Sequence, residues 1–381
     1  MKRFKIIYFL IAFGFSLTSC SDDDDVNLAK LSFAETDYIS EYRIQVFDTL
    51  SINPQIRNSS SNTQYAWYLN DTMISEDSHL NYEMTTEGTF NLLFRASESL
   101  EQIERTYTVI VEDNYTKYFR PITGNSSPFI TKVLTYKPAP GQFLNTAFAS
   151  EEAAESIVGG MDGLVSLGAW GGYIEFMFDH TIENIPSEKD FVIFANAFDG
   201  SSEPGIVQVS FDENGNGIAD DTWYEIAGDA HFKDEVIRNY EVTYFNPNGA
   251  EDIPFIDNQG NEGALRMNVY HDQPYYPAFI PEQESITFKG TKVYAPFYVN
   301  DQGWVTSDNL EYGYVDNFSE EFSDYRGNTI DLDWAVNELM QPVELRGIDF
   351  VRVYTGSFDQ SDVLGEMSTE IAGAANLVLY P

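Results

Sequence analysis

The chain has 381 residues, enough for two domains and a targeting segment. It carries 61 acidic against 21 basic side chains, a net charge of −40, which argues against a nucleic-acid partner because phosphate backbones bind to basic faces. The single cysteine excludes an intramolecular disulfide framework and a zinc–thiolate cluster.

The first residues predict a signal peptide. Basic residues at positions 2, 3 and 5 precede an apolar run over residues 6–17, which is shorter than the about 20 helical residues that cross a bilayer. The run ends in Leu17-Thr18-Ser19-Cys20, a tract that resembles the lipobox of bacterial lipoproteins. The resemblance implies a signal peptide over residues 1–19 and a lipidated Cys20; the alternative is an ordinary cleavage site beside a chance cysteine.

An acidic tether follows over residues 20–27. The four consecutive aspartates at residues 22–25 resemble the export signal that follows the lipidated cysteine of Bacteroidetes surface lipoproteins, although a solvated acidic spacer has the same composition. The resemblance implies a lipid anchor in the outer membrane and a chain that faces the cell exterior. No later apolar stretch of the sequence is long enough to cross a membrane.

Residues 28–112 have the pattern of a small all-β domain. Polar and apolar residues alternate over residues 65–69, 90–94 and 107–111, between clusters of Asn, Ser and Asp. We expect Trp67 to fill the centre of a sandwich core. The tracts around Trp67 and Gly88 resemble PKD-like, immunoglobulin-type modules of surface proteins, which implies that this domain is a spacer.

Residues 113–128 are a linker or an entering segment, and residues 129–381 predict a larger β-sandwich of the jelly-roll kind. Helical patterns are confined to residues 150–156, with Ser150 as N-cap, and residues 334–340. Strands are expected at residues 174–178, 191–196, 207–211, 223–226, 241–245, 285–288, 350–354 and 376–380. The predicted fold class is all-β, an N-terminal immunoglobulin/PKD-like sandwich followed by a larger jelly-roll-like sandwich.

The loop at residues 212–221 has the spacing of calcium ligands. Oxygen-bearing side chains occupy positions 1, 3, 5 and 9 of an EF-hand-type loop, with glycine at position 6 and a free backbone carbonyl at position 7. Position 12 is Trp223 instead of Glu, so Asp221 or Glu225 would complete the set. Two Asn-Gly pairs also make a plain hairpin without an ion, and this alternative stays open. The candidate ligands of a structural calcium ion are Asp212, Asn214, Asn216, the carbonyl of Ile218, Asp220 and Asp221.

Several tracts between residues 129 and 380 resemble a family of Bacteroidetes cell-surface lipoproteins with a C-terminal β-sandwich. The tracts are residues 136–145, 165–174, 190–198, 203–209, 221–225, 347–356 and 364–370. The resemblance implies a layout similar to galactose-binding or discoidin-like jelly rolls. Members often accompany TonB-dependent uptake systems for corrinoids and glycans, which implies an accessory role in capture and a TonB-dependent transporter as partner.

Aromatic residues in polar or glycine-rich loops are the candidates for ligand contact. An aromatic ring beside Asp, Asn or Gln offers an apolar plate and oriented hydrogen bonds, which suits a glycan or a corrinoid. The alternative for each ring is cover over the edge of a sandwich. The candidates are Trp170, Tyr270, His271, Asp272 and Trp304.

The sequence lacks a clear catalytic motif. Its four histidines are scattered, and it contains no His-Glu-x-x-His run, no Gly-x-Ser-x-Gly elbow and no phosphate-binding glycine loop. We therefore expect a protein that is not an enzyme and that binds an extracellular glycan or corrinoid as an accessory to nutrient uptake. The alternatives are a surface glycan hydrolase and a structural or adhesive surface protein.

Overall fold

The computed structural model describes residues 30–34, 38–320 and 322–380. The predicted signal peptide, the acidic tether and Cys20 lie outside the described residues. The chain divides into two compact units, Met1–Asp113 and Asn114–Pro381. Strands make up 44% of the chain and helices 6%, which confirms the all-β prediction. Within the described ranges, no helix is both long enough and apolar enough to cross a membrane.

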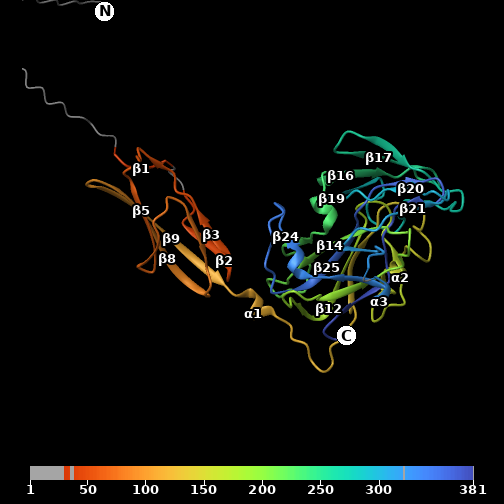
Figure 1. The fold of residues 1–381 in the computed structure, drawn as a ribbon, viewed down its shortest axis with the longest axis horizontal. Helices are drawn as coiled ribbons and strands as arrows, with labels where there is room; N and C mark the ends of the chain where they lie inside the picture. The colour runs from red at the N-terminus through yellow and green to blue at the C-terminus, as the bar shows by residue number, and fades with distance from the viewer. Residues whose placement is uncertain (1–29, 35–37, 321, 381) are drawn as a thin grey trace, which may run out of the picture. The chain divides into compact units, whose positions relative to one another are not determined.

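The first unit is built around a five-stranded sheet. Its strands are β1 (Ser32–Phe33), β2 (Glu41–Gln45), β3 (Thr49–Ile52), β4 (Ile56–Arg57), β5 (Gln64–Leu69), β6 (Thr72–Ser75), β7 (Leu80–Glu83), β8 (Gly88–Glu98) and β9 (Glu101–Glu112). The sheet has the order β2-β9-β8-β5-β6. Strand β2 is parallel to β9, and β8 and β9 form a long antiparallel hairpin. The pairs β3–β7 and β1–β4 complete the unit (Figure 1).

Trp67 lies in the core of the first unit, as predicted. Its side chain is fully buried, its ring centre is 4.6 Å from that of Phe94, and its Nε1 donates to the carbonyl of Asp77 at 2.9 Å. Trp67 on β5 pairs directly with Phe94 on β8. Because directly paired residues share one face of a sheet, the alternating pattern places both rings on the buried face. The three strands expected from this alternation are confirmed by β5, β8 and β9.

The second unit consists of short strands with few helical turns. In chain order the elements are α1 (Asn114–Tyr118), β10 (Lys132–Lys137), α2 (Glu151–Glu155), β11 (Val165–Ser166), β12 (Tyr173–Glu183), β13 (Phe191–Phe194), β14 (Gly205–Ser210), β15 (Trp223–Ile226), the 3₁₀ helix η1 (Asp229–Phe232), β16 (Ile237–Phe245), β17 (Ile253–Asp257), β18 (Glu262–Leu265), β19 (Ser285–Lys292), β20 (Phe297–Val299), β21 (Val305–Ser307), β22 (Tyr314–Val315), α3 (Phe322–Tyr325), β23 (Gly327–Ile330), the 3₁₀ helix η2 (Leu332–Trp334), β24 (Ala335–Val336), β25 (Gly347–Thr355), β26 (Gln360–Ser361), β27 (Gly365–Glu366), β28 (Glu370–Ile371) and β29 (Gly373–Asn376).

These strands form three layers. The middle layer is a seven-stranded sheet with the order β10-β12-β25-β14-β15-β24, to which β22 is added beside β14. The sheet β23-β13-β29 packs on one face of this layer, and the sheet β18-β17-β16-β19 packs on the other. Figure 1 shows β16, β17 and β19 at the top of the second unit, above β14 and β25. The middle layer and the three-stranded sheet form the predicted sandwich, and the four-stranded sheet is an additional layer.

Strand β25 shows how the middle layer is buried from both sides. Val351 and Val353 belong to the core beneath the three-stranded sheet, whereas Tyr354 belongs to a core on the opposite face. A strand covered on both faces has a nearly continuous apolar sequence. Arg352 is the one residue of β25 that is not fully buried.

Residues 114–128 enter the second unit. Arg120 donates from Nη2 to Oδ1 of the buried Asp349 at 2.8 Å and from Nη1 to the carbonyl of Phe178 at 3.0 Å. Because Asp349 lies on β25 and Phe178 on β12, these contacts attach the segment to the middle sheet. Of the two alternatives for this stretch, a linker or an entering segment, these contacts favour the entering segment.

Most local expectations for the second unit hold, and two are wrong. Helix α2 is confirmed, with Ser150 Oγ accepting from the Ala153 N–H at 3.2 Å. The helix expected at residues 334–340 is wrong: only residue 334 is helical, as the end of η2, and residues 335–336 pair with β15 as β24, so tertiary pairing outweighs local propensity. The last strand is Gly373–Asn376 instead of residues 376–380, because it pairs with β13 as far as Phe191.

Candidate ligand-binding groove

Four polar side chains form a row across the middle sheet. Glu175 on β12 pairs with Arg352 on β25. Arg352 also pairs with Gln208 on β14, which in turn pairs with Glu225 on β15. Directly paired residues project from the same face of a sheet. The row therefore lies on the face that the four-stranded sheet covers in part.

Arg352 is held in place by polar and aromatic contacts. Its Nε and Nη2 donate to Glu175 Oε1 at 2.8 and 2.6 Å, and its Nη1 donates to Gln208 Oε1 at 2.9 Å. Its guanidinium carbon lies 4.1 Å from the centre of the Trp223 ring and 5.3 Å from that of Tyr173. Both rings are partly exposed. Cation–π contact with a guanidinium fixes the rings as well as the cation.

Glu225 ends the row and has both carboxylate oxygens occupied. Oε1 accepts from Thr291 Oγ1 at 2.6 Å, and Oε2 accepts from the Tyr354 hydroxyl at 2.8 Å. Burial raises the pKa of Glu225, but hydrogen bonds from His231, Thr291 and Tyr354 outweigh burial and hold that pKa below its ordinary value. Glu225 is therefore ionised at neutral pH and is not a proton donor.

His231 completes the network beneath Glu225. The Gly228 N–H donates to His231 Nδ1 at 3.1 Å, so the ring proton is on Nε2. Nε2 then donates to Glu225 Oε1 at 3.1 Å, and the Tyr314 hydroxyl lies 2.6 Å from Nδ1. Because the ring is fully buried, His231 serves to orient the carboxylate and does not contact solvent.

Two adjoining cavities above the row form one hollow, which we call the Arg352 groove. Their volumes are about 320 and 200 Å³, and both are lined by Gln208, Lys289 and Arg352. The middle sheet supplies the floor and β19 supplies a wall. The remaining lining residues are Lys137, Gly171, Tyr173, Trp223, Glu225, Arg238, Asn239, Thr287, Phe288, Gly290, Thr291, Val336, Asn337, Glu338, Met340 and Tyr354.

The structure does not place Trp170 in a ligand-facing loop, which corrects the prediction for this residue. Its side chain is 0% exposed, and its ring packs edge-on against Tyr240 with centres 4.6 Å apart. The neighbouring Gly171 has φ +88°, and a Cβ there would lie 2.4 Å from the Cβ of Phe288. The glycine thus allows β19 to approach closely, and the four-stranded sheet covers the indole.

The other predicted ligand residues lie on the surface, outside the Arg352 groove. Tyr270 is 77% exposed and Asp272 is exposed, while the His271 ring packs edge-on against Phe143 with centres 5.2 Å apart. Trp304 is 68% exposed in the turn between β20 and β21, where its N–H donates to Asn300 Oδ1. None of these four lines the groove.

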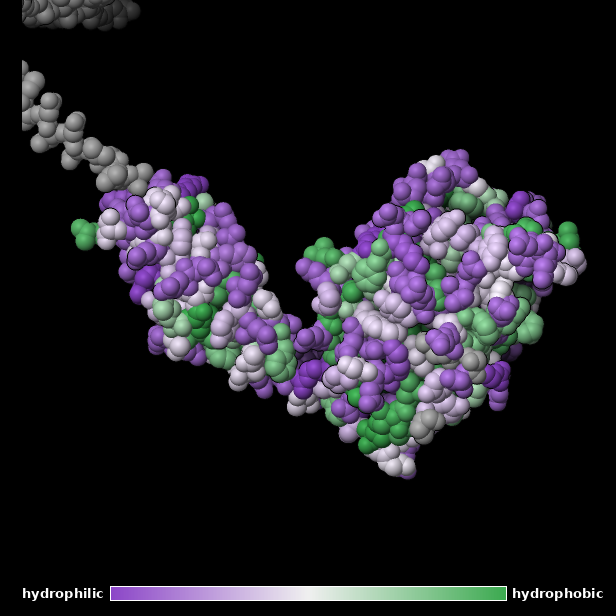
Figure 2. Space-filling view, in the orientation of Figure 1, coloured by the Kyte–Doolittle hydropathy of each residue, from purple (hydrophilic) through white to green (hydrophobic). Residues whose placement is uncertain are grey.

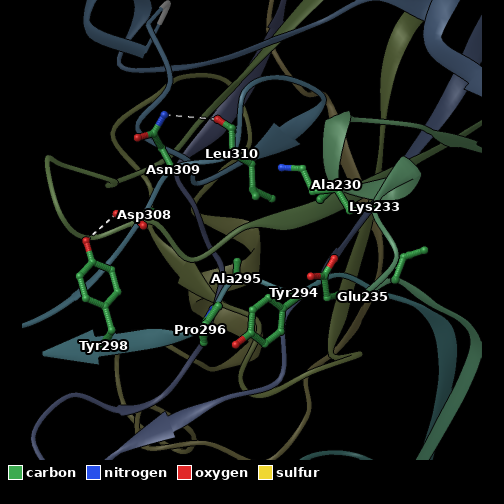
Figure 3. A pocket seen from close by; sticks show the side chains of 11 residues that line it. Ala230, Lys233, Glu235, Tyr294, Ala295, Pro296, Tyr298, Asp308, Asn309 and Leu310 are labelled. Carbon is green, nitrogen blue, oxygen red and sulfur yellow. Dashed lines mark hydrogen bonds between the residues drawn. The ribbon is translucent and has the colours of Figure 1, made fainter.

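A second hollow, of about 380 Å³, lies between the β20–β21 hairpin and the segment after η1 (Figure 3). Tyr294 and Tyr298, 63% and 43% exposed, contribute aromatic rings to it. Figure 3 shows Tyr298 bonded to Asp308, and the hydroxyl donates to Oδ1 at 2.5 Å. Trp304 is not among the residues that line it. This hollow lacks the cross-strand polar row that characterises the Arg352 groove.

The predicted calcium loop has most of its oxygens turned towards its own backbone. Asp212 Oδ1 accepts from the Gly215 and Asn216 N–H groups at 2.7 and 3.1 Å, and Oδ2 accepts from Gly217 at 2.9 Å. The carboxylate of Asp221 has one oxygen, Oδ2, without a partner among the described residues. Burial, together with Asp212 and Asp220, raises the pKa of Asp221. Calcium binding by this loop stays a prediction.

The amides of the same loop connect its acidic residues. The Asn214 and Asn216 side chains donate to Asp221 Oδ1 and Asp220 Oδ1 at 3.1 and 3.2 Å. The side-chain oxygens of both asparagines accept from the backbone two residues on, at Asn216 and Ile218. These Asx turns also suit the plain hairpin that the sequence left open.

A second group of carboxylates was not predicted from the sequence. Carboxylate oxygens of Glu203, Asp316 and Glu370 lie within 4.8 Å of one another and could hold a cation. Burial raises the pKa values of all three, that of Glu370 to about 7, and repulsion by Glu370 raises those of Glu203 and Asp316 further. The residues come from distant parts of the chain, and each looks like an ordinary surface acid in the sequence.

Comparison with known proteins identifies the first unit. Residues 35–98 match the family model of the PKD-like domain. No curated protein of similar sequence was found. Because the matched residues include Trp67 and the strands around it, the structure and the family model describe the same module.

Solved structures with some similarity include three proteins of the following kinds. A SusE-like protein is 8% identical, with 91% of this chain and 96% of that chain covered and a TM-score of 0.24. A Bacteroides ovatus mixed-linkage glucan utilization protein, solved with a heptasaccharide, is 11% identical, with 90% and 70% covered and a TM-score of 0.19. A quinonprotein alcohol dehydrogenase-like protein from Bacteroides thetaiotaomicron is 11% identical, with 79% and 72% covered and a TM-score of 0.21.

Similarity at these TM-scores supports no conclusion about the function of this chain. The family assignment therefore rests on the match at residues 35–98, on the buried Trp67 and on the strands that surround it. The first unit contains a PKD-like domain at residues 35–98, as the sequence predicted.

Proposed function

We propose that the second unit binds a saccharide in the Arg352 groove and does not transform it. The observation that carries this proposal is the arrangement around Arg352. Tyr173 on β12 and Trp223 on β15 flank the two strands that hold Arg352 and Gln208, and both rings contact the guanidinium. Sugar rings are recognised by apolar plates together with fixed hydrogen-bonding groups, and this groove offers both.

The carboxyl groups in and beside the groove support binding without catalysis. A glycosidase needs a carboxylic acid with a raised pKa to protonate the leaving group. The pKa of Glu225 is lowered instead, and Glu175 is bonded to Arg352 at 2.6 Å. Besides Glu225, the carboxylate that lines the groove is that of Glu338, which is exposed. The groove residues therefore supply no acid of the kind that glycoside hydrolysis needs.

The surface role belongs to the same proposal. The sequence predicts a lipid anchor at Cys20 and an acidic tether, and the PKD-like domain follows them in the chain. We propose that the saccharide-binding unit is displayed at the outer membrane and passes its ligand to a TonB-dependent transporter. Figure 2 shows hydrophilic residues spread over the visible face of the second unit, with smaller hydrophobic patches among them, as on a solvated surface.

The test is binding of a glycan panel to the chain lacking only its first 27 residues, measured by calorimetry. We expect a glycan to bind, Trp223→Ala to abolish binding, and Trp304→Ala, an equally large truncation outside the groove, to leave it intact. Loss of binding in Trp304→Ala but not in Trp223→Ala would place the site elsewhere. Release of a product from the bound glycan would overturn the non-catalytic part of the proposal.

A further inference from the structure

The lining of the Arg352 groove has more basic than acidic residues, whereas the chain as a whole is strongly acidic. The whole sequence has 61 acidic and 21 basic side chains. The groove is lined by four basic residues, Lys137, Arg238, Lys289 and Arg352, and by two acidic ones. In a chain with a threefold excess of acid, a lining with more bases than acids is a local feature of this site and not a consequence of composition.

Two of the four cations have carboxylate partners. Arg352 is bonded to Glu175 at 2.6 Å, and Lys137 to Glu282 at 2.6 Å. These pairs fix the geometry of the floor and of one end of the groove, but their charges are largely compensated. They contribute directed N–H groups more than net positive charge.

The other two cations, Arg238 and Lys289, are not compensated. In the parts of the chain that the structure describes, neither has a carboxylate within ion-pair distance. Arg238 donates from Nη2 to the carbonyl of His231 at 2.9 Å, which orients the guanidinium without neutralising it. Glu241 lies opposite Lys289 in the β16–β19 register, but the two do not form an ion pair. Both cations are exposed and line the larger of the two cavities.

The two acidic residues of the groove, Glu225 and Glu338, differ in their surroundings. Both oxygens of Glu225 accept hydrogen bonds, from Thr291 and His231 on one side and Tyr354 on the other. Its charge is thus stabilised by hydrogen bonds from buried neighbours. Glu338 is exposed, after β24, and can turn into solvent. The exposed charged groups that line the larger cavity are thus two cations, Arg238 and Lys289, and one carboxylate, Glu338.

We infer that the saccharide bound in this groove carries an anionic substituent, a carboxylate or a sulfate. The inference rests on the proposed function and names the class of its ligand. An Arg–Lys pair without carboxylate partners matches an anionic group through charge-assisted hydrogen bonds, which are shorter and stronger than neutral ones. The aromatic rings would contact the sugar face while Arg238 and Lys289 hold the charged substituent.

The experiment compares ligands that differ only in charge. Oligogalacturonides are measured against their methyl esters, and chondroitin sulfate oligosaccharides against the desulfated forms, by calorimetry on the chain lacking its first 27 residues. We expect one acidic member to bind at least about tenfold more tightly than its neutral counterpart. The pair that shows this difference identifies the substituent as carboxylate or sulfate.

Matched variants assign the effect to the groove. Arg238→Gln and Lys289→Gln together should weaken the acidic ligand about tenfold and leave the neutral counterpart unchanged. Lys132→Gln, which removes an exposed cation of β10 outside the groove, should change neither, and melting temperatures should show that all variants fold. An acidic preference that survives the double variant would overturn the inference.

The remaining outcomes separate the inference from the proposed function. Binding of neutral glycans as tight as that of acidic ones, lost in Trp223→Ala, would overturn the inference and leave saccharide binding standing. Failure of every glycan to bind would overturn both. Binding of a corrinoid, abolished by Trp223→Ala, would likewise overturn both, and is tested with cyanocobalamin in the same calorimeter.

Discussion

The guanidinium of Arg352 lies 4.1 Å from the centre of the Trp223 ring, although the two residues are on strands separated by β14. The long side chain of Arg352 crosses Gln208, to which it donates at 2.9 Å, before it meets the indole. A single arginine thus connects four strands of the middle sheet. The stability of the sheet and the shape of the groove floor depend on the same side chain.

Replacing Arg352 with methionine should destabilise the second unit. The substitution keeps most of the side-chain volume but leaves Glu175, 8% exposed, without its cation. Breaking a buried pair costs several kcal/mol, and because Arg352 is 25% exposed we expect about 2–4 kcal/mol in the free energy of unfolding. Denaturant unfolding followed by tryptophan fluorescence gives this value.

The matched control for Arg352→Met is Arg266→Met. Arg266 pairs with Asp362 at 3.1 Å, but the two side chains are 54% and 81% exposed. Exposed pairs contribute little, so the control should change the free energy of unfolding by no more than about 0.5 kcal/mol. Equal effects of the two substitutions would show that the Arg352 pair is not buried in solution.

Trp170 should behave as a core residue. Trp170→Ala removes a fully buried ring and should cost about 3–5 kcal/mol in the free energy of unfolding. Its Nε1 has no hydrogen-bond partner among the described residues, so Trp170→Phe loses no polar contact and should cost no more than about 2 kcal/mol. Thermal or denaturant unfolding distinguishes the two. A Trp170→Ala chain of normal stability that fails to bind ligand would restore the earlier prediction of a stacking platform.

Two buried tryptophans, Trp67 predicted correctly and Trp170 wrongly, show what a sequence can reveal. Trp67 was predicted correctly because alternation along its own strand determines which face it occupies. The burial of Trp170 depends on β19, which approaches through Gly171, and no local pattern reports a contact over that distance. Alternation also predicted three strands of the first unit, whereas the strands expected in the second unit came from the spacing of turn residues between them.

The groove could not be predicted because its parts are far apart in the chain. Arg352 and Glu175 are 177 residues apart, and Arg352 and Gln208 are 144 apart. The sequence does contain one usable signal, a single long polar residue in the middle of an apolar strand. Arg352 in Gly347–Thr355 and Gln208 in Gly205–Ser210 both fit this description. The third layer, which turns this polar row into a groove, has no such signal.

Stability should fall as the pH rises from about 4.5 to 8. Burial raises the pKa of Glu366 to about 8 and that of Glu370 to about 7, from an ordinary value of 4.5. A carboxyl group whose pKa is raised in the fold holds a proton that the unfolded chain releases. Its contribution is therefore complete below the unfolded pKa and is lost as the pH rises through the folded pKa. Melting temperatures measured with chelator present across this range test the slope.

Glu366→Gln should flatten this pH dependence. Glutamine cannot ionise and can still accept from the Gln142 N–H, which donates to Glu366 Oε1 at 2.7 Å. Glu344→Gln, at an exposed position, should leave the slope unchanged. A slope of the opposite sign, or one that Glu366→Gln does not alter, would contradict the assignment of the buried proton to Glu366.

Calcium should raise the melting temperature through the loop at residues 212–221. The unpartnered Asp221 Oδ2 and the neighbouring carboxylates of Asp212 and Asp220 favour a cation, since all three repel one another without one. At a calcium concentration a hundred times the dissociation constant, the stabilisation is about 2.7 kcal/mol. Asp221→Asn should remove the rise, and Asp234→Asn, at an exposed aspartate outside the loop, should keep it.

A calcium effect must also be separated from binding at the buried carboxylates. Glu370→Gln replaces one of the three carboxylates of that cluster with an uncharged amide and leaves the loop untouched. If Glu370→Gln abolishes the rise and Asp221→Asn does not, the ion is in the cluster and the loop prediction is wrong. If calcium leaves the melting temperature unchanged, the loop is a plain hairpin, held by the hydrogen bonds from Gly215 and Gly217 to Asp212.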